Sequence, residues 1–244
     1  MPILETREVS VRFGGHMAVD DVSIAVEEGT ITGLIGPNGA GKTTAFNVIT
    51  GLQPPTRGKV LLGDQDITKM SAHKRARLGI ARTFQRLELF GSLSVLDNVL
   101  TAAELHQVEG QHPRVAAEAL LGRVGLADQV GQRADSQPTG NARLVELARA
   151  LACRPRVLLL DEPASGLDEE ETDRFARILL DLATDGLAIL LVEHDVPLVM
   201  RLCHEITVLN FGQVLARGTP PEIQRNEAVI EAYLGQGTDV GVDA

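Results

Sequence analysis

The stretch GPNGAGKTT at residues 36–44 is the most informative part of this sequence. It follows a short apolar run, residues 31–35, which predicts a strand. It precedes residues 43–50, which are compatible with a helix that ends at Gly51. A glycine-rich turn between a strand and a helix is the context that the G-x-x-x-x-G-K-[ST] motif requires. The pattern therefore predicts a phosphate-binding loop in an α/β fold rather than an ordinary glycine-rich turn.

The residue types in this loop explain how it would hold the phosphates of a nucleotide. Glycines can adopt backbone conformations that other residues avoid, so successive N–H groups can point at one anion. The following helix presents the positive end of its dipole to the same anion. Lys42 adds a charge for the β- and γ-phosphates, and the hydroxyl of Thr43 can ligate Mg²⁺. The predicted ATP-binding residues of the loop are Gly36, Pro37, Asn38, Gly39, Ala40, Gly41, Lys42, Thr43 and Thr44.

Composition limits the class of protein. The chain has 244 residues and 44% apolar content, which suffices for one large domain or for a core with a smaller lobe. Its net charge of −10 disfavours a non-specific nucleic-acid surface and gives no attraction to anionic lipid. We find no signal peptide, and the longest apolar run is far below the roughly 20 residues that cross a bilayer. We expect a cytosolic chain, unless another protein holds it at a membrane. Cys153 and Cys203 are expected to be free thiols.

A second informative stretch begins with the continuous apolar run at residues 157–160 and continues with Asp161 and Glu162. Continuous apolarity predicts a strand buried on both faces of a parallel sheet, and ligands of such sheets bind beyond the carboxyl ends of the strands. Unpaired buried carboxylates are unfavourable. We therefore predict that Asp161 holds Mg²⁺ through water and that Glu162 polarises the attacking water. The alternative is a helix N-cap with an adjacent surface acid.

Shorter patterns extend the α/β order on either side of these motifs. Residues 3–26 alternate apolar and polar side chains and predict two or three strands with a turn at Gly14-Gly15. Further strands are predicted at residues 59–62, 80–85, 188–192, 206–209 and 213–216. Helices are predicted at residues 72–78, between the cap Asp168 and Gly186, and at residues 221–234.

Three side chains have two interpretations when they are considered alone. Phe13 is either plain core, which its spacing favours, or a ring that stacks on a base. Gln85, at the end of a predicted strand, is usually a surface amide. His194, at the end of another, is either a core histidine with satisfied hydrogen bonds or a contact for the γ-phosphate.

The block at residues 86–155 has a different character and predicts an inserted, mostly helical lobe. Ser94 starts a helix that extends to about residue 108, and further helices are predicted at residues 115–124 and 141–152. We therefore expect a single ATP-binding domain at residues 1–235. In it, residues 1–85 and 156–235 form the β lobe and the α/β core, and residues 236–244 form a flexible tail.

Taken in order, these features resemble the ATP-binding subunit of ABC transporters over nearly the whole chain. The shared set is the phosphate loop, Gln85, the helical lobe, VLLLDEP at 157–163, SGLD at 165–168 and His194. Three stretches are similar to the branched-chain amino acid uptake group: GIARTFQRLELFGSLSVLDNV at 79–99, VEHDVPLVMRLCHEITVLNFGQVLARGTPPEI at 192–223 and IEAYLG at 230–235. The resemblance implies a P-loop NTPase fold: a mostly parallel sheet core, an N-terminal antiparallel β lobe and an inserted α-helical lobe.

The resemblance also implies a role for each matching residue. Gln85 matches a glutamine that ligates Mg²⁺ or water at the joint between the lobes. Asp161 matches the acid that holds Mg²⁺, Glu162 the catalytic base and His194 the switch histidine. Phe13 falls where the family has its adenine-stacking aromatic, so stacking replaces plain core as the expectation. Asp168 closes the loop that follows Glu162 and is counted with the nucleotide-binding residues.

The sequence departs from the family at the signature loop, which reads about LSGGQ in the family and QPTGN here, residues 137–141. The signature serine becomes Pro138, which has neither a hydroxyl nor a backbone N–H. Thr139 replaces the first glycine and Asn141 the glutamine, whereas Gly140 is retained and is expected to contact nucleotide. A rival interpretation is that Thr139 supplies the missing hydroxyl one position along.

In the family, two subunits dimerise head to tail, and each ATP lies between one phosphate loop and the partner's signature loop. The site built on Lys42, Glu162 and His194 of this chain would then need a partner with an intact signature loop. The site that this chain completes for its partner would be weak. A mixed dimer would have one active and one impaired site, and a homodimer two impaired ones.

The function that the resemblance implies is energy coupling by ATP hydrolysis. The implied partners are a second ATP-binding subunit, two transmembrane permease subunits and, indirectly, an external solute-binding protein. The helical lobe and the Gln85 region are the expected docking surface, which would place the chain at the cytoplasmic face of the membrane. The prediction of branched-chain amino acids as the transported solute depends on the resemblance alone, and urea, amides or other small solutes remain alternatives. Other classes are a soluble ABC-type switch in translation or DNA repair and a small-molecule kinase.

Overall fold

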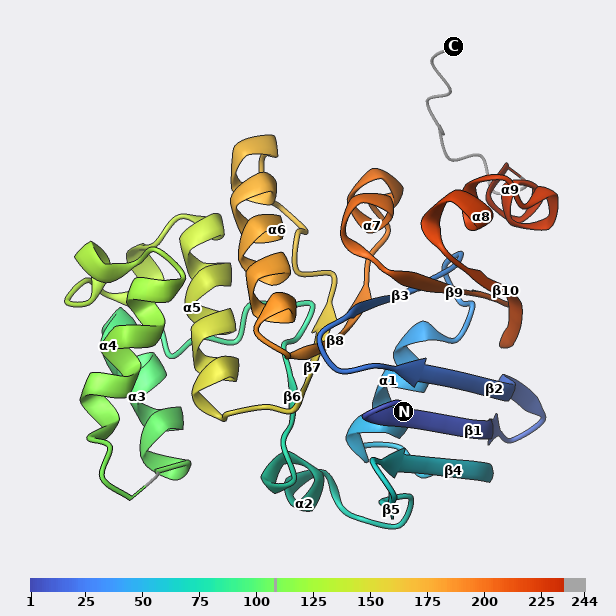
Figure 1. Ribbon diagram of the computed structural model, residues 1–244, viewed down its shortest axis with the longest axis horizontal. Coiled ribbons are helices and arrows are strands. Elements are labelled where there is room, and N and C mark those ends of the chain that lie inside the picture. Colours follow the sequence, from blue (N-terminus) through green and yellow to red (C-terminus); the bar gives the residue numbers. More distant parts are fainter. Residues whose placement is uncertain (108, 235–244) are drawn as a thin grey trace.

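The computed structural model describes residues 1–107 and 109–234 (Figure 1). The predicted tail at residues 236–244 lies outside the described residues. Two sheets and the helices around them make up the fold. Among the described helices, none combines the length and the apolar character that crossing a bilayer requires.

The N-terminal sheet is antiparallel and has the strand order β2-β1-β4-β5. Its strands are β1 (Leu4–Phe13), β2 (His16–Val26), β4 (Arg57–Leu62) and β5 (Gln65–Asp66). Gly14 and Gly15 lie between β1 and β2, as the sequence predicts, and the register pairs Phe13 with His16 across this turn. The first residues therefore form two strands of one hairpin.

The second sheet has six strands in the order β10-β9-β3-β8-β7-β6. These are β10 (Gln213–Gly218), β9 (Glu205–Asn210), β3 (Ile31–Ile35), β8 (Ala188–Val192), β7 (Val157–Asp161) and β6 (Ile80–Arg82). β10 pairs antiparallel with β9, and the other neighbours pair in parallel. The carboxyl ends of β3, β6, β7 and β8 therefore meet at one edge, where ligands of such sheets bind.

Side chains of β7 alternate between two hydrophobic clusters, one on each face of the sheet. Leu158 and Leu160 belong to the cluster that includes most of the helices. Val157 and Leu159 belong to the cluster that holds the first helix and the antiparallel sheet. The continuous apolarity of this run therefore reflects burial on both faces, as predicted.

Helix α1 (Lys42–Thr50) lies between the two sheets (Figure 1). Its buried residues Phe46, Val48 and Ile49 share one cluster with Leu4 of β1 and Leu34 of β3. The helix ends at Gly51, which has a φ of 80°, a left-handed conformation that glycine adopts without strain. This packing fixes the start of α1, and hence the phosphate loop, against both sheets.

Most of the remaining helices contribute buried residues to the cluster on the other face of the parallel sheet, whereas the first of them contacts α1. They are α2 (Ala72–Arg77), α3 (Val95–Leu105), α4 (Pro113–Arg123), α5 (Thr139–Ala152), α6 (Glu169–Thr184), α7 (Val196–Leu202), α8 (Pro220–Gln224) and α9 (Glu227–Leu234). Helices α3 and α4 lie farthest from the antiparallel sheet (Figure 1). Buried residues of α3, α4 and α5 belong to the same cluster as residues of β7 and β8. The division into lobes thus stays a prediction.

Several elements differ from the prediction. The final helix, predicted at residues 221–234, is two helices, because Asn226 lies between α8 and α9 and its Oδ1 accepts the N–H of Val229 at 3.2 Å. β6 ends at Arg82 rather than at Gln85, so Gln85 lies in the following loop. Helix α7 was not predicted; it begins at Val196, after the N-cap Asp195, whose side chain accepts the N–H of Leu198.

Candidate active site

The phosphate loop connects the carboxyl end of β3 to the first turn of α1. Gly36, Gly39 and Gly41 have φ values of 148°, 81° and 103°. A Cβ at Gly36 would lie 2.1 Å from the carbonyl oxygen of Leu209, and one at Gly41 would lie 2.6 Å from that of Ala18. A Cβ at Gly39 would meet nothing within 4 Å. The loop is therefore packed against the protein at both ends and faces open space in the middle, as an anion-binding backbone must.

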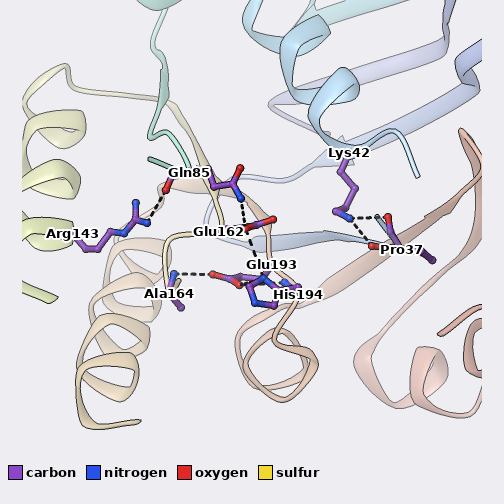
Figure 2. A network of polar contacts seen from close by, with 9 residues as sticks. Pro37, Lys42, Gln85, Arg143, Glu162, Ala164, Glu193 and His194 are labelled. Atoms are coloured by element: carbon purple, nitrogen blue, oxygen red, sulfur yellow. Dashed lines mark hydrogen bonds and ion pairs between the residues drawn. The ribbon is translucent and has the colours of Figure 1, made fainter. Parts of the chain in front are cut away.

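Lys42 is the charged residue of this loop, and its ammonium rests on the loop itself. Nζ donates to the carbonyl oxygens of Gly36 at 2.5 Å and Pro37 at 3.1 Å (Figure 2). Burial lowers the pKa of Lys42, and the nearby carboxylates of Glu162 and Asp161 act in the opposite direction. The lysine therefore lies within electrostatic reach of both predicted acids.

Asp161 ends β7 and has a protein cation as its partner. Arg82 Nη2 donates to Asp161 Oδ2 at 2.7 Å, and the two side chains are only 10% and 9% exposed. The prediction that Mg²⁺ offsets this buried carboxylate leaves out Arg82. The signal was present, since Arg82 is a charged residue at the end of a short, otherwise apolar strand.

Glu162, the predicted base, has a strained backbone. Its φ of 47° is left-handed, a conformation that costs a non-glycine residue of order 1–3 kcal/mol and clusters at functional sites. Its N–H donates to the carbonyl oxygen of Val192 at 2.9 Å. Its Oε2 accepts a hydrogen bond from Gln85 Nε2 at 2.8 Å and lies 3.9 Å from His194 Nδ1 (Figure 2). The structure thus brings together the three predicted catalytic residues.

A buried arginine of α5 holds the loop that carries Gln85. Arg143 Nη2 donates to the carbonyl oxygen of Gln85 at 2.8 Å, and Nη1 donates to that of Phe84 at 3.2 Å. Nη1 also lies 3.3 Å from Glu146, whose pKa is raised mainly by burial. Sequence reasoning missed this residue. Its signal is an arginine and a glutamate three positions apart on a helix whose other buried residues are mostly apolar.

Glu193, between β8 and His194, is a third residue to which the sequence analysis assigns no role. Its Oε1 accepts the N–H of Ala164 at 2.8 Å, and its Oε2 accepts the N–H of His194 at 3.2 Å (Figure 2). Burial raises its pKa. Glu193 therefore ties the loop after Glu162 to the loop of His194, whose side chain is itself 69% exposed.

The other predicted nucleotide contacts lie outside this network. Phe13, at the end of β1, is 49% exposed, so the plain-core interpretation that spacing favours is wrong. Asp168 caps α6: its Oδ1 accepts the N–H of Glu171, whose side chain accepts the N–H of Asp168 in return. Gly140 is buried in the first turn of α5, where a Cβ would lie 2.3 Å from Glu171 Oε1. Pro138 is the N-cap of α5 and provides no side-chain cap.

The donor chemistry of the site fits Mg²⁺. The three predicted ligands are a hydroxyl, an amide and a carboxylate, from Thr43, Gln85 and Asp161, and hard cations of this kind take oxygen ligands. Thr43 is exposed in the first turn of α1. Among the described residues, no group of three or more His, Cys, Asp or Glu residues could hold a metal alone. A cation here would share its coordination with phosphate oxygens and water, as Mg²⁺ commonly does.

Two family models match the sequence. The model of the ABC transporter family matches residues 19–165, from β2 to just beyond the predicted acids. The chain belongs to the ABC transporter family. A second model, of the branched-chain amino acid ATP-binding cassette transporter, matches residues 213–239. The predicted family, its branched-chain amino acid group and the P-loop NTPase fold class are therefore confirmed.

Individual relatives agree with this assignment. The chain is 40% identical to the high-affinity branched-chain amino acid transport ATP-binding protein BraF of Pseudomonas aeruginosa, over 96% of this chain and 98% of that protein. It is 39% identical to LivG of Escherichia coli with the same coverage. It is also 36% identical to the lipopolysaccharide export system ATP-binding protein LptB of Escherichia coli, over 97% and 98%.

Among solved structures, the ADP conformation of MJ1267, an ATP-binding cassette of an ABC transporter, is similar. The TM-score is 0.89 with 30% identity, over 96% of this chain and 99% of that one. A nucleotide-free cassette gives a TM-score of 0.87 at the same identity and coverage. The chain is thus a nucleotide-binding ATPase cassette, and it is the ATP-binding subunit of an ABC transporter.

Proposed function

We propose that this cassette hydrolyses MgATP to drive the uptake of branched-chain amino acids through membrane subunits to which it binds. The main support for this substrate class is the match of residues 213–239 to the branched-chain amino acid cassette model. The identity to BraF and LivG supports it. LptB is named for lipopolysaccharide export and is 36% identical over nearly the whole chain. The proposal of uptake and of this solute class therefore depends on the match at residues 213–239 and on the higher identity to BraF and LivG.

The residues of the network divide the work of hydrolysis. The glycine loop and Lys42 bind the phosphates, with the Lys42 ammonium moving from the carbonyl oxygens of the loop to phosphate oxygens. Phe13, exposed at the end of β1, would stack on the adenine. Mg²⁺, when bound with ATP, neutralises charge that develops on the phosphates.

Glu162 is the proposed base, and it must exchange partners before it can act. In this structure its Oε2 accepts a hydrogen bond from Gln85, and that acceptor is the one a water would need. Rotation of Gln85 toward the cation would free Glu162 to accept the proton of the attacking water. His194, 3.9 Å away and largely exposed, can then reach the γ-phosphate.

The proposed assembly is a head-to-tail pair of cassettes in which ATP binding closes the dimer. In it, the start of α5 faces the partner's nucleotide, and here this start has Pro138 in place of serine. We therefore infer two unequal sites, with the active one formed by this phosphate loop and a partner's intact signature loop. Thr139, exposed at the first helical position, is the residue on which the rival interpretation depends.

Co-purification and turnover test this proposal. The chain is expressed with its neighbouring membrane subunits, second cassette and solute-binding protein, and ATP turnover is measured with leucine, isoleucine, valine, urea or an amide. We expect stimulation by the branched-chain amino acids alone. Stimulation by urea or amides would contradict the solute class, and failure to co-purify with hydrophobic subunits would contradict transport.

A matched pair of variants tests the unequal sites. Glu162→Gln in this chain should abolish most turnover, whereas the equivalent change in the second cassette should remove little. When Glu162→Gln has inactivated one site, the remaining turnover comes from the site that this chain's signature loop completes. Adding Pro138→Ser to Glu162→Gln should therefore raise turnover. Equal losses from the two glutamate changes would count against the inequality.

A further inference from the structure

Arg82 connects three parts of the candidate site. It ends β6, next to β7, and its side chain is only 10% exposed. Nη2 donates to Asp161 Oδ2 at 2.7 Å, and Nη1 donates to Asn47 Oδ1, in α1, at 2.7 Å. One planar group therefore joins the acid at the end of β7 to the helix that begins at the phosphate loop.

The same guanidinium also lies over two aromatic rings. Its Cζ lies 5.6 Å from the ring centre of Phe46, a buried residue of α1, and 5.1 Å from that of Phe84. Phe84 precedes Gln85 directly and is exposed, so the loop that carries the predicted switch glutamine touches Arg82. Within the described part of the chain, Arg82 Nε is buried without a hydrogen-bond partner. The position of Arg82 thus follows from the two acceptors and the two rings.

The charge pair is favourable only as a pair. A buried carboxylate whose partner is removed is strongly destabilising, because the remaining charge is left without compensation. Arginine also presents a rigid fork of donors, which lysine does not, so it can serve Asp161 and Asn47 together. The geometry therefore holds the Asp161 carboxylate in one orientation before any nucleotide binds.

We propose that Arg82 is a positioning residue for ATP hydrolysis. It orients Asp161 toward the cation that accompanies the nucleotide, and through Phe84 it links that orientation to the position of the Gln85 loop. Arg82 does not touch the reacting atoms and acts through Asp161. The inference rests on the proposed hydrolytic role of this site, and it adds a residue that the family resemblance does not supply.

The test uses Arg82→Met, Arg82→Lys, Asp161→Asn and the double change Arg82→Met/Asp161→Asn in the complete transporter complex. Turnover is measured against ATP and against Mg²⁺ concentration. For Arg82→Met we expect kcat to fall about tenfold or more, with the KM for ATP changed less than about threefold. The Mg²⁺ concentration for half-maximal activation should rise. Arg82→Lys should recover only part of kcat. A fall in the Mg²⁺ requirement would overturn the proposal, since Arg82 would then act as a competing cation.

A second readout does not depend on turnover. The melting temperature of the isolated chain is measured without Mg²⁺ and without nucleotide. Arg82→Met should lower it, and adding Asp161→Asn should restore part of the loss, because the uncompensated charge is removed. If the double variant melts below Arg82→Met, the two side chains are not coupled and the proposal fails.

Arg75 offers a matched control. It is also a buried arginine, but its guanidinium donates to backbone carbonyl oxygens, among them those of Val48, Ile49 and Thr68. Arg75→Met should lower the melting temperature and leave kcat and the Mg²⁺ requirement unchanged. If it shifts the Mg²⁺ requirement as Arg82→Met does, loosening of the fold explains both and the proposal is overturned.

Failure of this inference is distinguishable from failure of the proposed function. If Glu162→Gln abolishes turnover while Arg82→Met behaves as the wild type does, only the role of Arg82 is wrong. If Glu162→Gln leaves turnover intact, the proposed function of the site is wrong.

Discussion

Three side chains that are predicted to bind or hydrolyse MgATP form hydrogen bonds with other groups of the protein in this structure. Lys42 donates to carbonyl oxygens of its own loop, Asp161 accepts from Arg82, and Glu162 accepts from Gln85. Each bond satisfies a charged or polar group that would otherwise be partly buried without a partner. Binding of substrate therefore exchanges existing hydrogen bonds, and activity depends on how readily each residue changes partners.

The charge of Lys42 is expected to matter for binding rather than for the fold. Lys42→Ala should weaken ATP binding by roughly 10- to 100-fold, since hydrogen bonds to charged groups contribute about 1.5–3 kcal/mol. Binding of a fluorescent ATP analogue measures it. Lys59→Ala, which removes an exposed lysine 4.0 Å from Asp66, serves as the control and should bind normally. Equal affinities in the two variants would contradict the role of Lys42.

At the scale of elements, the glycines of the phosphate loop are not equivalent. Ala at position 41 or 39 is strained by about 1–2 kcal/mol, because both have positive φ. Of these two positions, only at Gly41 would the new Cβ also meet a backbone oxygen, at 2.6 Å, so Gly41→Ala should unfold at clearly lower denaturant concentration than Gly39→Ala. Urea unfolding of both variants measures this difference. Equal midpoints would show that the loop relaxes around Gly41.

Helix α5 is linked to the predicted switch glutamine through the backbone. Arg143→Met removes the donors to Phe84 and Gln85, so turnover should fall about tenfold while ATP affinity changes less than about threefold. Parallel measurements of turnover and binding separate the two effects. Arg149→Met, which removes an arginine over the ring of Phe90 in the same helix, is the control. Similar losses in both variants would point to damage of α5 as a whole.

Motifs and continuous apolar runs predicted most elements of the parallel sheet and the phosphate loop, because these signals are local in sequence. The break at Asn226 and the short helix α7 depend on single capping bonds, which a long apolar pattern hides. The hydrogen bonds of Arg82 to Asp161, of Arg143 to Gln85 and of Glu193 to Ala164 join residues 29 to 79 positions apart. Pairings at such separations follow from the topology of the sheet, so the residues were visible in the sequence but their partners were not.

For the molecule as a whole, packing around Cys203 makes stability depend on pH. Burial raises the pKa of this thiol from 9.0 to about 12. Above pH 9 the thiol ionises in the unfolded chain but stays protonated in the fold, so the free energy of unfolding falls as pH rises toward 12. Urea unfolding at pH 8, 9 and 10 should show this decline, and Cys203→Ala should reduce it. If the free energy of unfolding falls equally with pH in the wild type and in Cys203→Ala, Cys203 is not its cause.

Hydrolysis at Glu162 is the claim on which transport, the unequal sites and the role of Arg82 depend. The most direct measurement compares ATP binding and ATP turnover of the wild type and Glu162→Gln in the same complex. We expect the variant to keep ATP affinity, since the amide oxygen can still accept from Gln85, and to lose about 100-fold or more in turnover. Turnover within a few-fold of the wild type, at unchanged affinity, would contradict the account.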